Sequence, residues 1–203
     1  MHPSVDDTVL LVVDMQNGFC HDDGAINRMG LPAARLRGAV EPCARLVAAA
    51  RAARVPVLFT RYVYRPDYAD GGLLVDELMP GLKTHEALRA GSWDAEVIDA
   101  LAPEAGERVI DKNRPSAFFG TDLEATLKTL GTRNLVVCGV TTNCCVETTV
   151  RDASQRDIRT FVVRDAVAEY DDERHAVALK SMALLFAYVV GLDDVLTGWP
   201  AAE

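Results

Sequence analysis

The sequence contains no long hydrophobic run, and this absence excludes a membrane-spanning helix. A span needs about 20 consecutive apolar residues, whereas the first apolar run covers residues 8–13 and stops at Asp14. Two acidic residues, Asp6 and Asp7, precede that run in place of a basic stretch, so we expect no signal peptide at this end. We therefore expect no membrane partner.

The five cysteines follow neither a disulfide pattern nor a zinc pattern. Their number is odd, and three of them are dispersed along the chain. Cys144 and Cys145 are adjacent, so a disulfide between them would be strained. Adjacent cysteines also lack the C-x-x-C spacing of redox motifs. The four histidines each stand alone, so no ligand set for zinc is present. The sequence predicts a reducing, cytoplasmic location, with no metal ion and no cofactor.

A dense stripe of Lys and Arg is also missing. The chain has 30 acidic and 21 basic residues, which gives a formal net charge of −9. Nucleic-acid binding depends on basic side chains that neutralise phosphates, so this composition argues against a nucleic-acid partner. The excess of acidic residues is typical of a surface that keeps a protein in solution.

Strand-like and helix-like segments alternate along the chain. With 203 residues, 49% of them hydrophobic, we expect a single domain spanning 1–203 with a full core. The alternation predicts an α/β fold with a mostly parallel, six-stranded sheet and helices on both faces. Residues 65–91 are broken by Pro and Gly and are expected to border a site. The expected strands are 8–13, 57–62, 108–111, 135–138, 159–163 and 187–190, and the expected helices are 33–54, 95–101, 121–130, a segment ending near 156, and 172–186.

Three of these strands end at residues with reactive side chains. Asp14 follows the first strand, Lys112 the third, and a Gly-led turn that contains Cys145 the fourth. The carboxyl ends of parallel strands lie at one edge of a sheet, so the three side chains can meet. A cysteine near a helix N-terminus is favoured as thiolate, and the nearby N–H groups can stabilise an oxyanion.

This set indicates nucleophilic attack on a carbonyl carbon. Cys145 would be the nucleophile, Asp14 the proton acceptor and donor, and Lys112 the cation that lowers the thiol pKa. Each residue also has a purely structural interpretation, because an Asp after a strand often caps a turn, Lys112 can be a solvated partner of Asp111, and Cys144 and Cys145 can be small buried side chains. Only their joint occurrence favours catalysis.

The three motifs that carry these residues, VVDMQNGF, DKNRPSAF and GVTTNCCVETTVRDA, resemble those of the isochorismatase-like cysteine hydrolases. The resemblance extends from Val9 to about Val195. It implies a three-layer α/β/α fold and an Asp14–Lys112–Cys145 triad.

The same resemblance separates the twin cysteines. Its pattern G-x-x-T-x-x-C-V selects Cys145 over Cys144 as the nucleophile. It further implies a cis, non-proline peptide between Val140 and Thr141, an oxyanion hole made by the N–H groups of Thr141 and Cys145, and a homo-oligomer, either dimer or tetramer.

The motif segments look most like those of family members that hydrolyse ureido or carbamoyl amides, namely ureidoacrylate amidohydrolases, biuret hydrolases and N-carbamoylsarcosine amidases. Phe19 matches a family position that packs on the substrate, while Trp93 and Phe118 are candidates for the same wall, with core packing as their alternative. The sequence thus predicts a cysteine amidohydrolase that cleaves a small-molecule amide or ureido bond through a thioester.

Two other interpretations stay open. One is a metal-dependent, nicotinamidase-type amidase, which is disfavoured because the segment after the second strand, TRYVYRPDYADGG, holds no histidine. The other is a binding protein that keeps the fold without catalysis, which the intact triad argues against. True isochorismatases lack the nucleophilic cysteine, so that subgroup is disfavoured as well.

Overall fold

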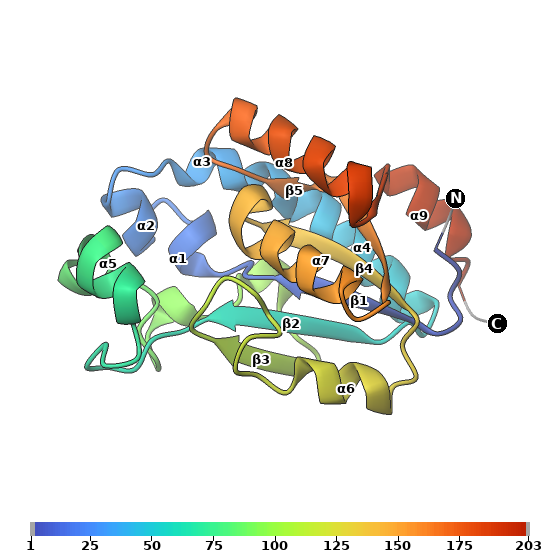
Figure 1. The fold of residues 1–203 in the computed structure, drawn as a ribbon, viewed down its shortest axis with the longest axis horizontal. Coiled ribbons are helices and arrows are strands. Elements are labelled where there is room, and N and C mark those ends of the chain that lie inside the picture. Colours follow the sequence, from blue (N-terminus) through green and yellow to red (C-terminus); the bar gives the residue numbers. More distant parts are fainter. Residues whose placement is uncertain (1–2, 202–203) are drawn as a thin grey trace.

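A six-stranded parallel sheet forms the centre of the computed structural model, which describes residues 3–201 (Figure 1). Every neighbouring pair of strands is parallel, so the predicted six-stranded sheet is confirmed and is parallel throughout. In space the strands follow the order β3-β2-β1-β4-β5-β6. Their bounds are β1 (Thr8–Val13), β2 (Val57–Tyr62), β3 (Arg108–Lys112), β4 (Asn134–Val140), β5 (Arg159–Ala168) and β6 (Tyr188–Val190).

The central strands β1 and β4 are buried along their whole length. Because side chains alternate across a strand, β1 feeds two separate cores. Leu10 and Val12 belong to the core on one face of the sheet, and Val9, Leu11 and Val13 belong to the core on the other face. Burial on both faces explains why these strands read as continuous apolar runs.

Helices cover both faces, which makes three layers and confirms the predicted α/β/α architecture. One core includes Leu46 and Val195, from α4 (Val40–Ala52) and α9 (Leu192–Gly198). The opposite core includes Leu127, Val150 and Met182, from α6 (Leu123–Thr129), α7 (Glu147–Ser154) and α8 (Asp172–Leu185). No helix in the described range 3–201 is long and apolar enough to cross a membrane.

Short helices gather at the end of the sheet toward which the β2 arrow points in Figure 1. They are α1 (Asn17–Cys20), α2 (Ala25–Arg28) and α5 (Gly81–Thr84). A π-helical turn, Leu74–Leu78, lies just before α5 in the chain. The broken segment 65–91 is therefore partly helical, and it lies at the carboxyl edge of the sheet.

Two helix predictions need correction. The expected helix 33–54 is divided into α3 (Ala33–Leu36), a 3-10 turn and α4. The expected helix 95–101 is wrong: two 3-10 turns, Trp93–Ala95 and Asp99–Leu101, flank an extended stretch. Its backbone is engaged elsewhere, since the Ile98 N–H donates to the carbonyl of Met15 at 2.9 Å and the Asn17 N–H donates to that of Glu96 at 3.0 Å.

Candidate active site

Asp14 lies directly after β1, fully buried at the carboxyl edge of the sheet. Its backbone adopts a left-handed conformation with φ of 50°, which aspartate tolerates better than most residues. The hydroxyl of Thr60, on the neighbouring strand β2, donates to Asp14 Oδ1 at 2.7 Å. The carboxylate is thus held in place by the adjacent strand.

Lys112 is the last residue of β3 and its side chain is also buried. Its Nζ lies 2.6 Å from Asp14 Oδ2 and 3.4 Å from Cys145 Sγ. Since β2 separates β3 from β1, the lysine passes over Tyr62 of β2, with Nζ 4.3 Å from the ring centroid. Burial by itself would lower the pKa of Lys112, but Asp14 and Cys145 more than offset this and raise it, so the group is an ammonium.

The chain reaches Cys145 through an abrupt turn after β4. Gly139 has φ of +112°, and a Cβ there would lie 2.0 Å from the carbonyl oxygen of Val13, so only glycine fits. The pairing of β4 with β5 shifts register at this point, and the peptide between Val140 and Thr141 is cis. A π-helical turn, Thr142–Val146, then leads into α7. Among the described residues, the Thr141 N–H has no hydrogen-bond partner.

The adjacent thiols of Cys144 and Cys145 influence each other. The neighbouring thiol of Cys144, and then burial, raise the pKa of Cys145 well above that of an ordinary thiol, while Lys112 opposes the rise. The same interaction lowers the pKa of Cys144. Lys112 nevertheless contacts the sulfur of Cys145. A thiol of raised pKa needs a base to ionise, and Asp14, which contacts the same Lys112 ammonium as Cys145, can supply one.

A cavity of about 350 Å³ opens at Cys145 and Thr141. Phe19, for which a substrate contact is predicted, is among its lining residues. Segment 65–91 supplies a further wall made of Leu74, Met79, Leu82 and Leu88, which the sequence left unassigned.

Trp93 and Phe118 do not line this cavity. Trp93 is 46% exposed and packs edge-on against His21, with ring centroids 5.0 Å apart. Phe118 is buried, and the Arg156 guanidinium lies 4.6 Å from its ring centroid. Packing against other protein side chains therefore describes the environment of Trp93 and Phe118 better than the predicted contact with substrate.

The sequence analysis did not identify several of the residues that line the cavity. Tyr62 ends β2 and Tyr64 follows it, while Glu169 and Tyr170 follow β5, and all four line the cavity. The strand-end rule that locates Asp14 also covers Tyr62, although a tyrosine side chain does not by itself suggest a nucleophile or a charge partner. Glu169 and Tyr170 lie beyond its reach, because β5 continues to Ala168, past the strand end expected at residue 163.

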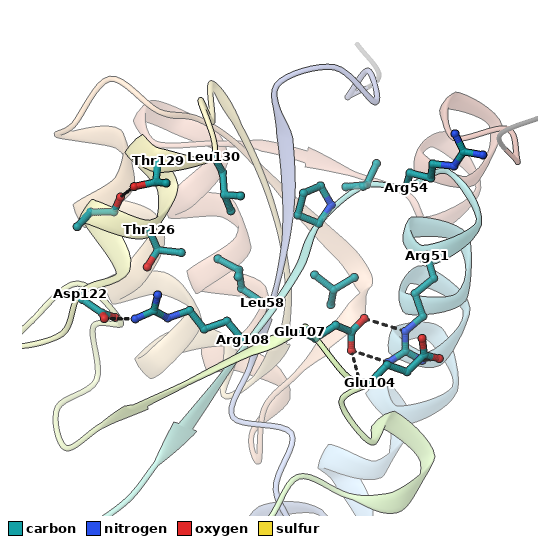
Figure 2. Close-up of a pocket in the computed structure, with 15 residues that line it drawn as sticks. Arg51, Arg54, Leu58, Glu104, Glu107, Arg108, Asp122, Thr126, Thr129 and Leu130 are labelled. Atoms are coloured by element: carbon teal, nitrogen blue, oxygen red, sulfur yellow. Dashed lines mark hydrogen bonds and ion pairs between the residues drawn. The ribbon is translucent and has the colours of Figure 1, made fainter.

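A larger cleft, of about 600 Å³, lies at the opposite edge of the sheet, where β2 and β3 begin (Figure 2). Its charged side chains pair with one another. Arg51 contacts Glu107 at 2.8 Å and Glu104 at 3.2 Å, and Arg108 pairs with Asp122. None of the predicted site residues lines this cleft. The larger cleft is therefore not the candidate active site.

The part of the chain that the structure describes contains no group of three or more His, Cys, Asp or Glu side chains suited to hold a metal ion. All five cysteines are free.

Comparison with known proteins adds independent findings. The profile of the Isochorismatase domain matches residues 8–194. A ureidoacrylate amidohydrolase RutB from Methylobacterium radiotolerans is 36% identical over 195 residues, which cover 90% of this chain and 75% of that protein. A solved cysteine hydrolase from Pseudomonas syringae pv. phaseolicola has a TM-score of 0.88 at 32% identity, covering 97% of this chain and 93% of its own. The N-carbamoylsarcosine amidase from Thermoplasma acidophilum has a TM-score of 0.77 at 28% identity, covering 92% and 96%.

Proposed function

Because this chain belongs to the isochorismatase family, we propose that it is a cysteine amidohydrolase that cleaves a small amide or ureido compound through a thioester. It is a hydrolase of carbon–nitrogen bonds other than peptide bonds. We propose Cys145 as the nucleophile and a thioester as the covalent intermediate. One observation carries it: the Lys112 ammonium contacts both the Asp14 carboxylate, at 2.6 Å, and the Cys145 sulfur, at 3.4 Å.

In the first half of the reaction, Asp14 accepts the proton of the Cys145 thiol, and Sγ attacks the carbonyl carbon. The carbonyl oxygen becomes an oxyanion that accepts hydrogen bonds from the N–H groups of Thr141 and Cys145. Asp14 then protonates the leaving nitrogen, the C–N bond breaks, and a thioester remains. Lys112 keeps the carboxylate oriented and offsets negative charge beside the sulfur.

In the second half, Asp14 takes a proton from water, and the hydroxyl oxygen attacks the thioester carbon. The C–S bond breaks, the acid leaves, and the proton returns to the sulfur of Cys145. The names of the similar proteins, a ureidoacrylate amidohydrolase and an N-carbamoylsarcosine amidase, support ureido and carbamoyl amides as the compounds to test. The homo-oligomer expected from the resemblance stays a prediction.

The choice of nucleophile can be tested by exchanging each cysteine. Cys145→Ala should lower kcat by at least about a thousandfold, because no covalent route remains, whereas Cys144→Ala should keep most of the activity. Ammonia release would be measured across ureido acids, biuret, carbamoyl amino acids and nicotinamide. Full loss of activity in Cys144→Ala with activity retained in Cys145→Ala would reverse the assignment. Loss of activity on addition of a chelator would favour the metal-dependent alternative.

A further inference from the structure

The cavity at Cys145 has an apolar wall. Attack of a thiolate on a carbonyl carbon does not by itself require such a wall. Ile26 of α2 and Leu31 form one side, and Leu74, Met79 and Leu82 from segment 65–91 form another. Leu31, Leu74 and Met79 are only partly buried, and such apolar side chains gain free energy by covering apolar surface of a ligand. Ile26 and Leu82 are 3% and 4% exposed and pack in the core beneath them.

The charged groups at this cavity are paired. Glu169, whose side chain is 2% exposed, accepts hydrogen bonds from the Asn143 and Tyr170 N–H groups. Arg174, the cation that lines the cavity, lies 3.9 Å from Glu169. Lys112, behind Cys145, is bound to Asp14. The described residues around the cavity thus offer a carboxylate ligand no cation that lacks an acidic partner.

Uncharged polar groups complete the site. The hydroxyls of Tyr62, Tyr64 and Tyr170 are buried and make no hydrogen bond within the described chain. Tyr62 and Tyr64 lie with ring centroids 5.2 Å apart and influence each other's pKa, but without the geometry of a hydrogen bond. Burial raises the pKa of Tyr64 to about 12, so this hydroxyl stays neutral. A buried hydroxyl without a partner is unfavourable, and an uncharged polar group of a ligand would relieve it.

We infer that the cavity takes an uncharged amide or ureide that carries an apolar group, in preference to a ureido or amido acid. The reacting carbonyl lies at Cys145, and the apolar group packs against the wall formed by Ile26, Leu74, Met79 and Leu82. The buried carboxylate of Glu169 disfavours a ligand carboxylate beside it, because like charges repel and the lining cation, Arg174, already faces Glu169 at 3.9 Å. This inference rests on the proposed function, since it names the substrate class of the same site.

Two matched pairs of compounds test this inference. Within each pair, one compound ends in a methyl group and the other ends in a carboxylate at the same position. Hexanamide is compared with adipamic acid, and propylurea with N-carbamoyl-β-alanine. We expect the methyl-ended member of each pair to bind Cys145→Ala at least about tenfold more tightly by isothermal titration calorimetry, and to show a similar ratio in kcat/KM with the unchanged protein.

Two arginine substitutions one residue apart provide the matched control. Met79 lines the cavity, and Leu78 is 68% exposed and does not. Met79→Arg should place an unpaired cation beside the ligand and reduce the preference for the methyl-ended member by at least about fivefold. Leu78→Arg adds the same charge outside the cavity and should leave the ratio unchanged.

The outcomes separate this inference from the proposed function. Equal or tighter binding of the acids to Cys145→Ala overturns the inference, and so does the absence of binding by every member of both pairs. If the acids bind better and are also hydrolysed, the amidohydrolase stands and only the substrate class is wrong. If the methyl-ended members bind better but the unchanged protein hydrolyses no amide at all, the proposed function fails while the inference about the ligand class holds.

Discussion

At the scale of single residues, the two adjacent thiols carry the most chemical information. Cys145 contacts Lys112, and its pKa is raised, first by the neighbouring thiol of Cys144 and then by burial. Cys144 is only partly buried, and its pKa is lowered by the same interaction. We therefore expect the thiol of Cys144 to influence the pH at which the proposed nucleophile ionises.

Cys144→Ala should shift the reactivity of Cys145 to lower pH. The substitution removes the largest cause of the raised pKa, so the thiolate forms at a lower pH than in the unchanged protein. The rate of iodoacetamide alkylation at Cys145 would be measured against pH, with mass spectrometry to assign the site. Cys43, whose pKa burial raises on the far side of the sheet, serves as an internal reference. An unchanged or upward-shifted curve for Cys145 would show that the two thiols are not coupled.

At the scale of elements, Asp94 joins the two walls of the cavity. Its carboxylate accepts from the Ala25 N–H, at the start of α2, at 2.8 Å and from the Leu88 N–H at 2.7 Å. Gly18 of α1 lies so close that a Cβ there would be 2.6 Å from Asp94 Oδ2. The carboxylate of Asp94 thus ties α2 to the end of segment 65–91.

Asp94→Ala should lower the free energy of unfolding by about 3 kcal/mol, because two buried N–H groups lose their acceptor. Asp94→Asn keeps one acceptor oxygen and should lose roughly half as much. Urea unfolding followed by circular dichroism measures both. The control is Asp76→Ala, at an exposed position of the same segment, which should leave the stability unchanged. A loss in Asp94→Ala no greater than in the control would show that the carboxylate does not hold the walls together.

At the scale of the whole molecule, acidic side chains bridge separate elements and make stability depend on pH. Hydrogen bonds from Lys128 and Arg156 lower the pKa of Glu124 to about 2 from the ordinary 4.5, which links α6 to the end of α7. The hydrogen bonds from Arg51 lower the pKa of Glu107, which links α4 to the start of β3. Each folded-state pKa is depressed, so the stabilisation is present above pH 4.5 and is lost as the pH falls through the folded-state pKa.

The double variant Glu107→Gln with Glu124→Gln should therefore lose less stability than the unchanged protein when the pH falls from 7 to about 3. The free energy of unfolding in urea at pH 7, about 4.5 and about 3 gives the two slopes. Glu77→Gln, at an exposed position, should keep the slope of the unchanged protein. Parallel slopes in the double variant and the unchanged protein would rule these two carboxylates out as the source of the acid sensitivity.

Much of the fold was predictable because local pattern and burial agree. The run 8–13 is apolar and β-branched since β1 is covered on both faces, and the strand ends at Asp14, Lys112 and the turn before Cys145 share one edge by topology. The helix expected at 95–101 failed for a nonlocal reason. The backbone of Glu96 and Ile98 forms hydrogen bonds with residues 15–17, and no local propensity encodes these.

The sequence by itself determined the alternation of strands and helices, the parallel sheet and the three reactive residues, because hydrophobic periodicity and residue chemistry are properties of short segments. Only the tertiary structure decided which side chains surround them. Tyr62, Leu82 and Glu169 are far apart in the chain and reach the cavity because β2, α5 and the end of β5 converge there. The pairing of Arg174 with Glu169, and the apolar wall opposite, are likewise set by packing, and they define the kind of molecule that the cavity can hold.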